Sequence, residues 1–328
     1  MATARKPGES RVPIAPERLA ELQGVGSLFR FLQRYPEIKR LQPGAEDRVL
    51  RGAFDVHIRA NPCTLISRGQ DVVDVAVEAS RAGMVAVCHK DHHHSTVGTA
   101  MMAQRHVDYL VERGEIPTRV ECYGGVPSTH TLDPRYVESA VGLPAFKMLW
   151  LNSVDGEVLI DGNRRVKPEA VAWIELARSH RLGITLGSPS QSKKYAGMDE
   201  YLGIMPVVEK IAEVGARCVL DHPLAHFTPE ETRRMTEAPG IYAGVFGYPT
   251  LPDVMKAPVV DPRTTQALVE LIGPERCILA SDEGQLLAAT AVETMRILVR
   301  LMLCYGLSAE QVRPMVVDNP RRLLWLDG

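Results

Sequence analysis

The chain has 328 residues, of which 45% are hydrophobic and 24% are charged, and its formal net charge at pH 7 is -2. This is the composition of an ordinary globular protein with one large domain or two smaller ones. The nearly neutral charge and the lack of a long apolar segment argue against nucleic acid and membranes as partners, and we expect a small-molecule substrate instead.

Residues 1–50 are predicted to form an N-terminal extension, with a helix at 17–34 lying over the base of the following domain. The first 16 residues are polar and charged and lack the apolar core of a secretory signal. The six cysteines form no Cys-x-x-Cys pair, and four of them lie in apolar, strand-like runs. Reduced thiols are therefore expected, and the sequence predicts a cytoplasmic protein.

From residue 52 onward, β-rich runs alternate with amphipathic helical patterns. Eight runs are nearly continuous in apolar residues, which is typical of parallel strands covered on both faces. They fall at 52–58, 84–89, 119–124, 145–151, 183–187, 217–222, 240–246 and 276–281. Helices are predicted at 71–82, 96–113, 168–181, 199–214, 229–237, 261–272 and 290–305. This pattern predicts one (β/α)8 TIM barrel over residues 51–328 rather than a doubly wound open sheet.

Several helix boundaries are marked by local chemistry. Asp133-Pro134 and Asp261-Pro262 place an N-cap aspartate before a proline that the first helical turn tolerates. Thr228 begins a capping-box-like start, and Gly215 stands where the preceding helix is expected to end.

In a TIM barrel, functional groups gather at the C-terminal ends of the strands. Those ends carry Asp55, His57, Arg59, Lys90, His92, Lys147, Trp150, Ser188, Asp221, His222, Tyr248 and Asp282. Imidazoles and carboxylates that converge from different strands form the ligand set of a Zn²⁺-type site. At such a site, the carboxylate after the last strand could both bind the metal and take a proton from its water.

Each candidate also has a structural interpretation. His89 could be a hydrogen-bonded structural residue at a strand end, and Lys147 could pair with an acid. Asp282 could be a helix N-cap. The run 92–94 consists of three histidines that cannot all face one ion, so only His92 is expected to point into the site.

Several short motifs follow one another in a recognisable order: Asp55-Val56-His57, Lys90-Asp91-His92, Asp221-His222-Pro223, ILASDEGQ at 278–285 and DNPRRLL at 318–324. With these motifs, residues 52–326 resemble the amidohydrolase superfamily, and more narrowly a family of predicted metal-dependent hydrolases. The resemblance implies a homo-oligomeric TIM-barrel enzyme with a metal held by His57, His222 and Asp282. It also implies that Lys90 and His92 line the site, and that Lys147 stands where some relatives carry a carboxylated lysine.

Two departures from that pattern bear on the metal. Arg59 stands where the family usually has a second histidine, and Ser188 follows Gly187 where relatives commonly have Gly-His. A guanidinium would put a fixed positive charge almost where a divalent cation should lie. The sequence therefore predicts at most one Zn²⁺ or Mn²⁺ per chain, or no metal at all.

Three functions remain open from the sequence. The first is a hydrolase of a C–N (amide, lactam or imide-like) or C–O bond, acting through a mononuclear metal-activated water, with Asp282, His92 and Lys90 as catalytic groups. Its substrate would contact Arg59, Lys147, Trp150, Ser188 and Tyr248. The second is a metal-independent lyase, decarboxylase or hydratase in which Arg59 and Lys90 bind a substrate carboxylate. The third is an inactive barrel that binds a ligand or a partner.

Overall fold

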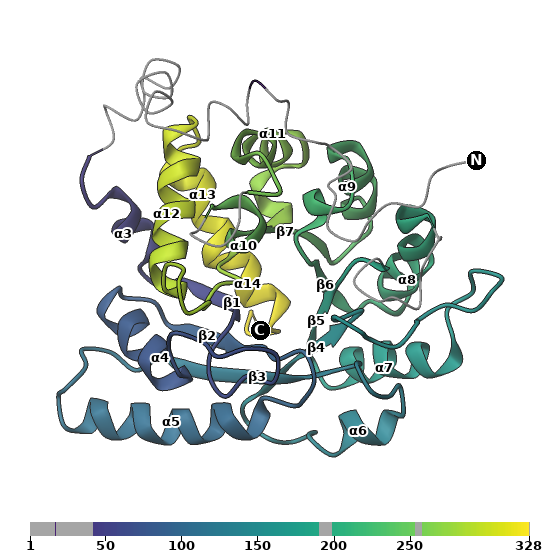
Figure 1. Ribbon diagram of the computed structural model, residues 1–328, viewed down its shortest axis with the longest axis horizontal. Coiled ribbons are helices and arrows are strands. Elements are labelled where there is room, and N and C mark those ends of the chain that lie inside the picture. Colours follow the sequence, from purple (N-terminus) through teal and green to yellow (C-terminus); the bar gives the residue numbers. More distant parts are fainter. Residues whose placement is uncertain (1–16, 18–41, 190–198, 253–257, 328) are drawn as a thin grey trace.

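The computed structural model describes residue 17 and residues 42–189, 199–252 and 258–327. In these ranges, eight parallel strands follow one another around a nearly closed barrel in the order of the chain (Figure 1). They are β1 (Phe54–Ile58), β2 (Ala86–His89), β3 (Glu121–Pro127), β4 (Phe146–Leu151), β5 (Gly183–Leu186), β6 (Arg217–Leu220), β7 (Ile241–Phe246) and β8 (Cys277–Ala280). The predicted TIM barrel is confirmed, whereas the predicted helix at 17–34 lies almost wholly outside the described residues.

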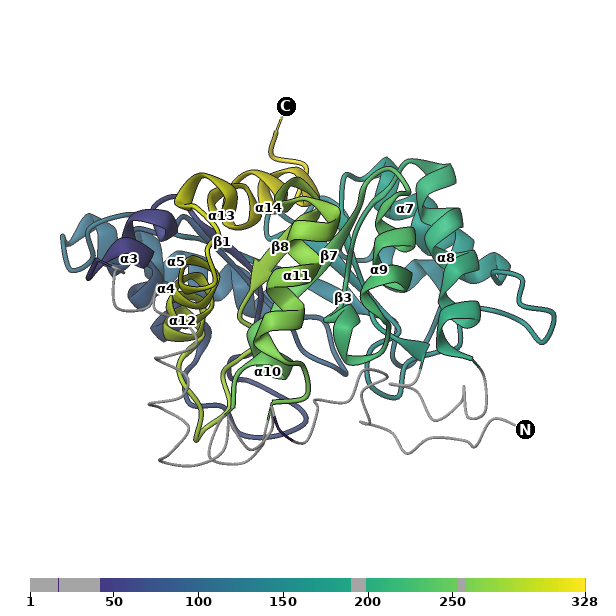
Figure 2. The same cartoon turned by 90° about the horizontal axis from the view of Figure 1, so that it is seen from above.

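Helices alternate with the strands, and most of them lie around the outside of the barrel (Figures 1 and 2). They are α3 (Ala45–Leu50), α4 (Val72–Arg81), α5 (Val97–Glu112), α6 (Pro134–Glu138), α7 (Pro168–Ser179), α8 (Glu200–Val214), η4 (Pro223–Ala225), α9 (Pro229–Thr236), α10 (Gly247–Thr250), α11 (Pro262–Ile272), η5 (Pro274–Arg276), α12 (Ala291–Cys304), α13 (Ala309–Val316) and α14 (Asp318–Leu323). Among the described helices, none is long and apolar enough to cross a membrane. The six cysteines all lie in the described ranges and are free.

The predicted helix boundaries are confirmed by their capping contacts. Asp133 and Asp261 each accept a hydrogen bond from the backbone of the first turn that follows. Thr228 and Glu231 form a reciprocal capping box at the start of α9. Gly215 ends α8 with a left-handed φ of 73°, a conformation that glycine adopts without a steric penalty.

Side chains alternate along each strand between the barrel interior and the surrounding helices. The interior is filled by Phe54, Val56, Ala86, Cys88, Tyr123, Met148, Trp150, Val219, Phe246, Ile278, Ala280, Leu323 and Leu324. The residues between them, such as Leu149 and Leu279, pack in the outer core against the helices. Because Val219 and Ala280 point inward, the same alternation directs Asp221 and Asp282 inward just beyond the ends of β6 and β8.

A register shift in β1 changes this alternation near the barrel mouth. The pairing with β2 is irregular between Asp55 and Ile58. Val56 belongs to the inner core and Ile58 to the outer one, so the phase changes between them. As a result, His57 and Arg59 both turn toward the mouth, as their spacing of two residues predicts.

The seam between β1 and β8 is closed by hydrogen bonds at the mouth. The amide of Asp282 donates to the carbonyl of His57 at 2.8 Å, and the amide of Arg59 donates to the carbonyl of Glu283 at 3.0 Å. The amide of Ser281 donates to the carboxyl of Asp55 at 3.2 Å. Burial raises the pKa of Asp55 to about 6. The seam thus joins residues that are 226 positions apart in the sequence.

Candidate active site

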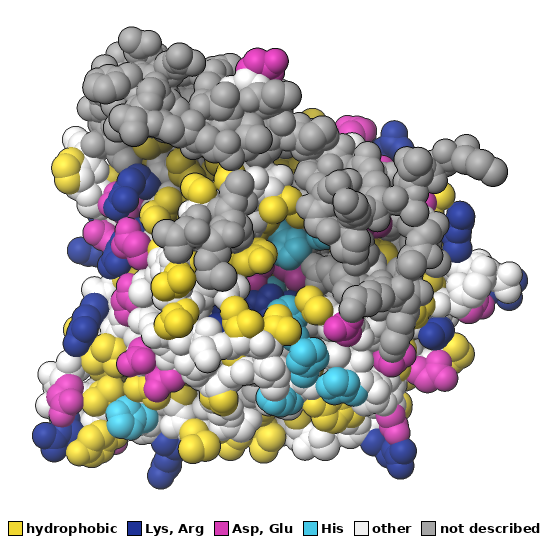
Figure 3. Space-filling model, viewed as in Figure 1, with side chains coloured by type: hydrophobic (Ala, Val, Ile, Leu, Met, Phe, Trp, Pro, Cys, Tyr) yellow, Lys and Arg dark blue, Asp and Glu magenta, His cyan; other side chains and the backbone are white. Residues whose placement is uncertain are grey.

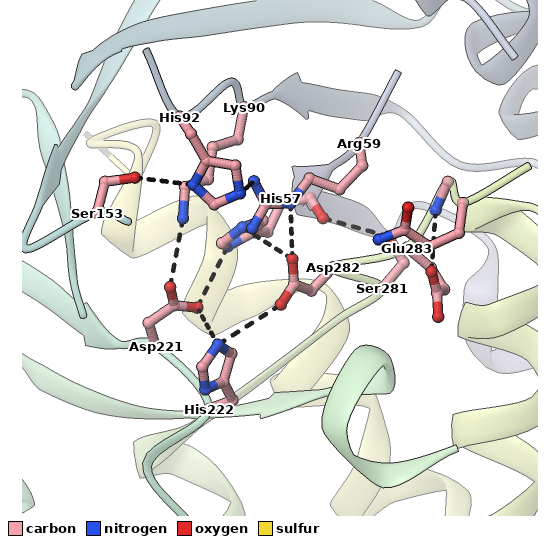
Figure 4. A network of polar contacts seen from close by, with 12 residues as sticks. His57, Arg59, Lys90, His92, Ser153, Asp221, His222, Ser281, Asp282 and Glu283 are labelled. Carbon is pink, nitrogen blue, oxygen red and sulfur yellow. Dashed lines mark hydrogen bonds and ion pairs between the residues drawn. The ribbon is translucent and has the colours of Figure 1, made fainter. Parts of the chain in front are cut away.

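Two histidines and two aspartates meet at the C-terminal mouth of the barrel (Figure 4). His57 Nε2 lies 3.2 Å from Asp282 Oδ1, and His57 Nδ1 lies 3.7 Å from Asp221 Oδ1. His222 Nε2 lies 3.7 Å from Asp221 Oδ1 and 3.8 Å from Asp282 Oδ2. His57 and the two aspartates are buried, and the side chain of His222 is only 12% exposed. We call these four residues the mouth cluster.

Two basic side chains each hold one oxygen of the two carboxylates. Arg59 Nε donates to Asp282 Oδ1 at 2.8 Å, and Lys90 Nζ donates to Asp221 Oδ2 at 3.3 Å. Burial alone would raise the pKa of both carboxyls, but the Arg59 charge lowers that of Asp282 and the Lys90 charge lowers that of Asp221. Burial lowers the pKa of His57 to about 4. The cluster therefore combines ionised carboxylates with a neutral imidazole at neutral pH.

The remaining atoms of the cluster fit a divalent cation. Among the described residues, the ring nitrogens of His57, Asp221 Oδ1 and Asp282 Oδ2 have no hydrogen-bond partner, although all are buried. One ligand atom from each of these residues can be chosen so that all three lie within 4.8 Å of one another. Ligands of a tetrahedral Zn²⁺ are about 3.3–3.6 Å apart, close to the separations of 3.7 and 3.8 Å that involve His222. Asp221 thus joins the predicted set of His57, His222 and Asp282.

His222 reaches the cluster through an unusual backbone conformation. Alternation along β6 directs Asp221 inward and would direct His222 toward the helices. His222 instead adopts φ 33° and ψ 60°, which turns its ring back to the mouth. Asp282 is also left-handed, with φ 46°. Aspartate tolerates this region better than most residues, and strained backbone of this kind is concentrated at functional sites.

His92 lies next to Arg59 at the edge of the cluster. Its Nε2 is 2.6 Å from Arg59 Nη1, and its Nδ1 is 3.0 Å from the hydroxyl of Ser153. Burial lowers the pKa of His92 below its ordinary value, and the charges of Arg59 and Lys90 lower it further. The neutral ring accepts from the guanidinium at Nε2 and donates to Ser153 from Nδ1.

A cavity of about 390 Å³ opens beside the mouth cluster. On the face shown in Figure 3, a hollow near the middle gathers acidic, basic and histidine side chains among hydrophobic ones. The cavity is lined by Arg59, Leu65, Arg68, His92, Val154, His222, Ala225, His226, Tyr248, Pro249, Val259, Asp282 and Gln285. One cavity therefore brings together five of the predicted site residues: Arg59, His92, His222, Tyr248 and Asp282. Lys90 is not among its lining residues and is paired with Asp221.

Three predicted substrate contacts lie elsewhere. Lys147 is the second residue of β4, at the end of the strand opposite the mouth, and it is not among the residues that line the cavity. The structure therefore does not bring Lys147 to the cavity where substrate contact was predicted, and the carboxylation that the resemblance implies stays a prediction. Trp150 is fully buried and fills the barrel interior, and Ser188 donates to Glu200 Oε2 at 2.6 Å.

Several residues of the site were not predicted as such. Asp221 was expected at a strand end but not as a metal ligand, although it follows the inward-facing Val219 by two positions. Arg68, Ser153 and His226 lie outside the strands, where no periodicity reveals which way a side chain points. His226 lines the cavity with its Nδ1 3.3 Å from Glu200 Oε2.

Asp91 braces the loop that follows β1. Its carboxylate accepts hydrogen bonds from the amide of Thr64 at 3.0 Å, the Thr64 hydroxyl at 2.6 Å and the amides of His93 and His94 at 2.8 and 3.2 Å. Burial alone would raise the pKa of Asp91, but these donors lower it below its ordinary value. The ionised form is therefore the one that stabilises the fold.

Replacing Asp91 with asparagine is expected to cost about 2 kcal/mol at pH 7, because one acceptor oxygen becomes a donor that faces N–H groups. A lowered pKa contributes stability that is complete above about pH 4, the ordinary aspartate range, and is lost as the pH falls. The difference in the free energy of unfolding between wild type and variant should therefore become smaller below about pH 4. Urea unfolding across this range measures it, with the exposed Glu270→Gln as control. A difference that stays constant with pH would contradict the assignment.

Comparison with known proteins agrees with this architecture. A zinc-bound amidohydrolase from Burkholderia multivorans matches with a TM-score of 0.55 and 13% identity over 83% of this chain and 99% of that chain. A probable 2-pyrone-4,6-dicarboxylic acid hydrolase from Acinetobacter baumannii, with citric acid bound, matches with a TM-score of 0.53 and 12% identity over 84% and 99%. A 2,6-dihydroxybenzoate decarboxylase from Rhizobium matches with a TM-score of 0.50 and 12% identity over 85% and 100%.

These similarities show that the chain shares the barrel fold of these enzymes. No curated protein matches the chain. The sequence model of a family of unknown function, DUF6282, matches residues 52–243, which include β1 to β7 up to Ala243 and therefore His57, Asp221 and His222. The chain belongs to this family, DUF6282.

Proposed function

We propose that this protein is a hydrolase that cleaves a C–N or C–O bond of a small molecule with the help of one divalent metal ion at the mouth cluster. The observation that carries the proposal is a pair of buried carboxylate oxygens, Asp221 Oδ1 and Asp282 Oδ2, that have no hydrogen-bond partner among the described residues. They lie 3.7 Å from His57 Nδ1 and 3.8 Å from His222 Nε2, respectively. Arg59 and Lys90 hold the other oxygen of each carboxylate, but a buried oxygen without a partner is costly, and a cation bound there would remove that cost.

The cluster residues have distinct roles in this proposal. His57, His222, Asp221 and Asp282 hold a Zn²⁺ or Mn²⁺ ion, which when bound polarises a substrate carbonyl and lowers the pKa of a water. Neutral imidazole and ionised carboxylate are the forms that ligate a metal, and these are the forms that burial and ion pairing favour here.

Arg59 and Lys90 serve as positioning residues. Each holds one oxygen of a carboxylate, so that the other oxygen keeps a fixed direction toward the cluster. The same contacts make Asp282 and His92 weak proton acceptors, since the positive charge of Arg59 opposes protonation of either group. We therefore assign to Asp282 the holding of the cation, and to His92 the holding of the Arg59 guanidinium, rather than proton transfer.

Proteins with the same fold give the proposal its chemical range. One is an amidohydrolase with bound zinc, one is a probable hydrolase of a dicarboxylic acid, and one is a decarboxylase of a dihydroxybenzoate. Because their sequence identity to this chain is low, the similarity supports only the fold. The reaction proposed for this chain therefore rests on its own mouth cluster.

A metal-independent lyase, decarboxylase or hydratase is the second candidate. The observation in its favour is that Arg59 and Lys90 already supply one positive charge to each carboxylate, so that the site is partly neutralised without a metal. The geometry favours it less, because Lys90 is 2% exposed and engaged by Asp221, which leaves it poorly placed to bind a substrate carboxylate.

The purified protein is expected to contain about one Zn²⁺ or Mn²⁺ per chain. Mass spectrometry of metals after gel filtration measures this ratio. His57→Gln should reduce it to background, whereas His106→Gln, an exposed imidazole on α5, should leave it unchanged. Chelation should abolish hydrolysis of a panel of carboxylate-bearing esters, lactams and amides, and one equivalent of metal should restore it.

The other outcomes identify the other candidates. Full turnover in a metal-free, chelated sample would overturn the metal proposal and favour the lyase or decarboxylase reading. A stoichiometric metal without turnover of any panel member would point to a barrel that binds a ligand without converting it.

A further inference from the structure

Arg68 differs from the other buried basic residues of the barrel. In the described part of the chain, the buried lysine and arginine side chains are Arg59, Lys90 and Arg68, the last with 4% exposure. Arg59 pairs with Asp282 and Lys90 pairs with Asp221. For Arg68, the described residues provide no carboxylate partner within ion-pair distance.

The contacts of Arg68 hold it in place without neutralising it. Its Nη1 donates to Gln285 Oε1 at 2.6 Å, and its Nε donates to Cys63 Sγ at 3.2 Å. Its backbone amide and carbonyl are both bound by the side chain of Asn61, at 3.1 and 2.9 Å. Two of the five N–H groups of the guanidinium thus donate to neutral atoms, and three remain for a ligand.

Arg68 belongs to the lining of the cavity beside the mouth cluster. Among the described lining residues that carry a full charge, Arg59 and Arg68 are positive and Asp282 is negative. Arg59 and Asp282 compensate each other, which leaves one positive charge in excess at Arg68. An arginine remains charged at any physiological pH, and burying it without a counter-ion is unfavourable. A negatively charged group on a molecule in the cavity would balance this charge.

We propose that Arg68 binds a carboxylate group of the substrate and so places the bond to be cleaved at the mouth cluster. The single excess charge matches a monoanion better than a phosphate dianion, and the planar guanidinium fits a carboxylate in a bidentate arrangement. The apolar Leu65, Val154 and Val259 in the same lining suit the carbon frame of a small acid. The inference rests on the proposed function in one respect, namely that the carboxylic acid bound by Arg68 is the substrate of the hydrolase.

The test uses benzoate as the probe and calorimetry of the purified, metal-containing protein. Wild type is expected to bind benzoate, and Arg68→Gln should weaken this binding roughly 10- to 100-fold. Arg68→Lys should recover part of the loss, because it keeps the charge but not the bidentate geometry. Arg105→Gln, which removes an exposed arginine on α5, should bind benzoate as wild type does.

A second measurement separates ligand binding from a structural role. If Arg68 serves a ligand, Arg68→Gln should unfold at the same or a higher temperature than wild type without benzoate, and it should lose the upward shift that benzoate gives wild type. A lower midpoint without ligand, an equal benzoate response in both proteins, or no response in wild type would overturn the proposal. Tighter binding of inorganic phosphate than of benzoate would overturn the carboxylate assignment.

Metal content distinguishes a failure of this inference from a failure of the proposed function. Arg68 contacts none of the four cluster residues through the hydrogen bonds described, so Arg68→Gln should keep about one metal per chain. Unchanged benzoate binding in a metal-loaded Arg68→Gln protein would reject the role of Arg68 and leave the hydrolase proposal standing. A wild-type protein without bound metal would instead reject the hydrolase proposal.

Discussion

Asp282→Asn is expected to lose both the metal and at least about 100-fold of the hydrolytic rate. The loss of a residue that merely supports a ligand costs about 10- to 100-fold in metal affinity or activity, so the loss of a ligand should cost more. Asparagine has almost the same size and tolerates the left-handed φ of 46° at this position. The backbone should therefore stay in place, and the effect should come from the missing charge.

The same substitution should also reduce the free energy of unfolding by about 3–5 kcal/mol, since Arg59 would be left buried without its carboxylate. Adding Arg59→Met to Asp282→Asn removes the unpaired charge, so the double variant should recover stability but not metal. Metal analysis, turnover of a substrate of the wild-type enzyme and urea unfolding measure the three quantities. Glu209→Gln, an exposed carboxylate on α8, is the control. An Asp282→Asn protein with full metal content would contradict the proposed ligand set.

Gly284→Ala is expected to destabilise the protein by about 2–6 kcal/mol and to disturb the mouth cluster as well. Gly284 has a φ of 149°, and a Cβ atom built on it would lie 1.7 Å from the carbonyl oxygen of Arg59. Either the loop after β8 or the end of β1 must move to relieve this overlap. Because the end of β1 carries Arg59, the ion pair with Asp282 should be weakened too.

A matched glycine on the barrel surface provides the control for this prediction. At Gly98, on α5, nothing lies within 4 Å of an added Cβ. Gly98→Ala should therefore leave stability unchanged or raise it by about 0.5–1 kcal/mol through helix propensity. Urea unfolding of both variants measures the difference. If Gly284→Ala proved as stable as Gly98→Ala, the close approach of the two strand ends would be wrong.

The fold could be predicted from the sequence because each strand and helix of a parallel barrel has a recognisable local sequence pattern. Strands buried on both faces appear as continuous apolar runs, and the helices between them carry entry and exit signals such as Asp261-Pro262 and Gly215. All eight predicted strands occur in the structure, in the predicted order. Each of these signals is confined to a few neighbouring residues, which is why a single sequence was enough.

The site was harder to predict because it depends on direction as well as position. Lys147 and Trp150 both belong to β4, but Lys147 lies near the start of the strand, away from the mouth, and Trp150 fills the packed interior. His222 reaches the cluster only through a left-handed backbone conformation, which no local sequence pattern predicts. Arg68 lies in a loop, and its importance follows from the absence of an acidic neighbour among the described residues, which only a three-dimensional structure reveals.

The seam between β1 and β8 also determines when the site can exist during folding. His57 and Arg59 come from the first strand and Asp282 from the last, and one of the hydrogen bonds at these strand ends joins residues 226 positions apart. Closing so long a loop carries an entropic cost that only the final contacts repay, so the ends of the barrel should dock late. A chain that has formed only the first seven strands still lacks Asp282 at the mouth, and Asp282 is the counter-ion of Arg59. The proposed metal site is thus completed in the same step that completes the barrel, so metal binding, if found, would report complete folding.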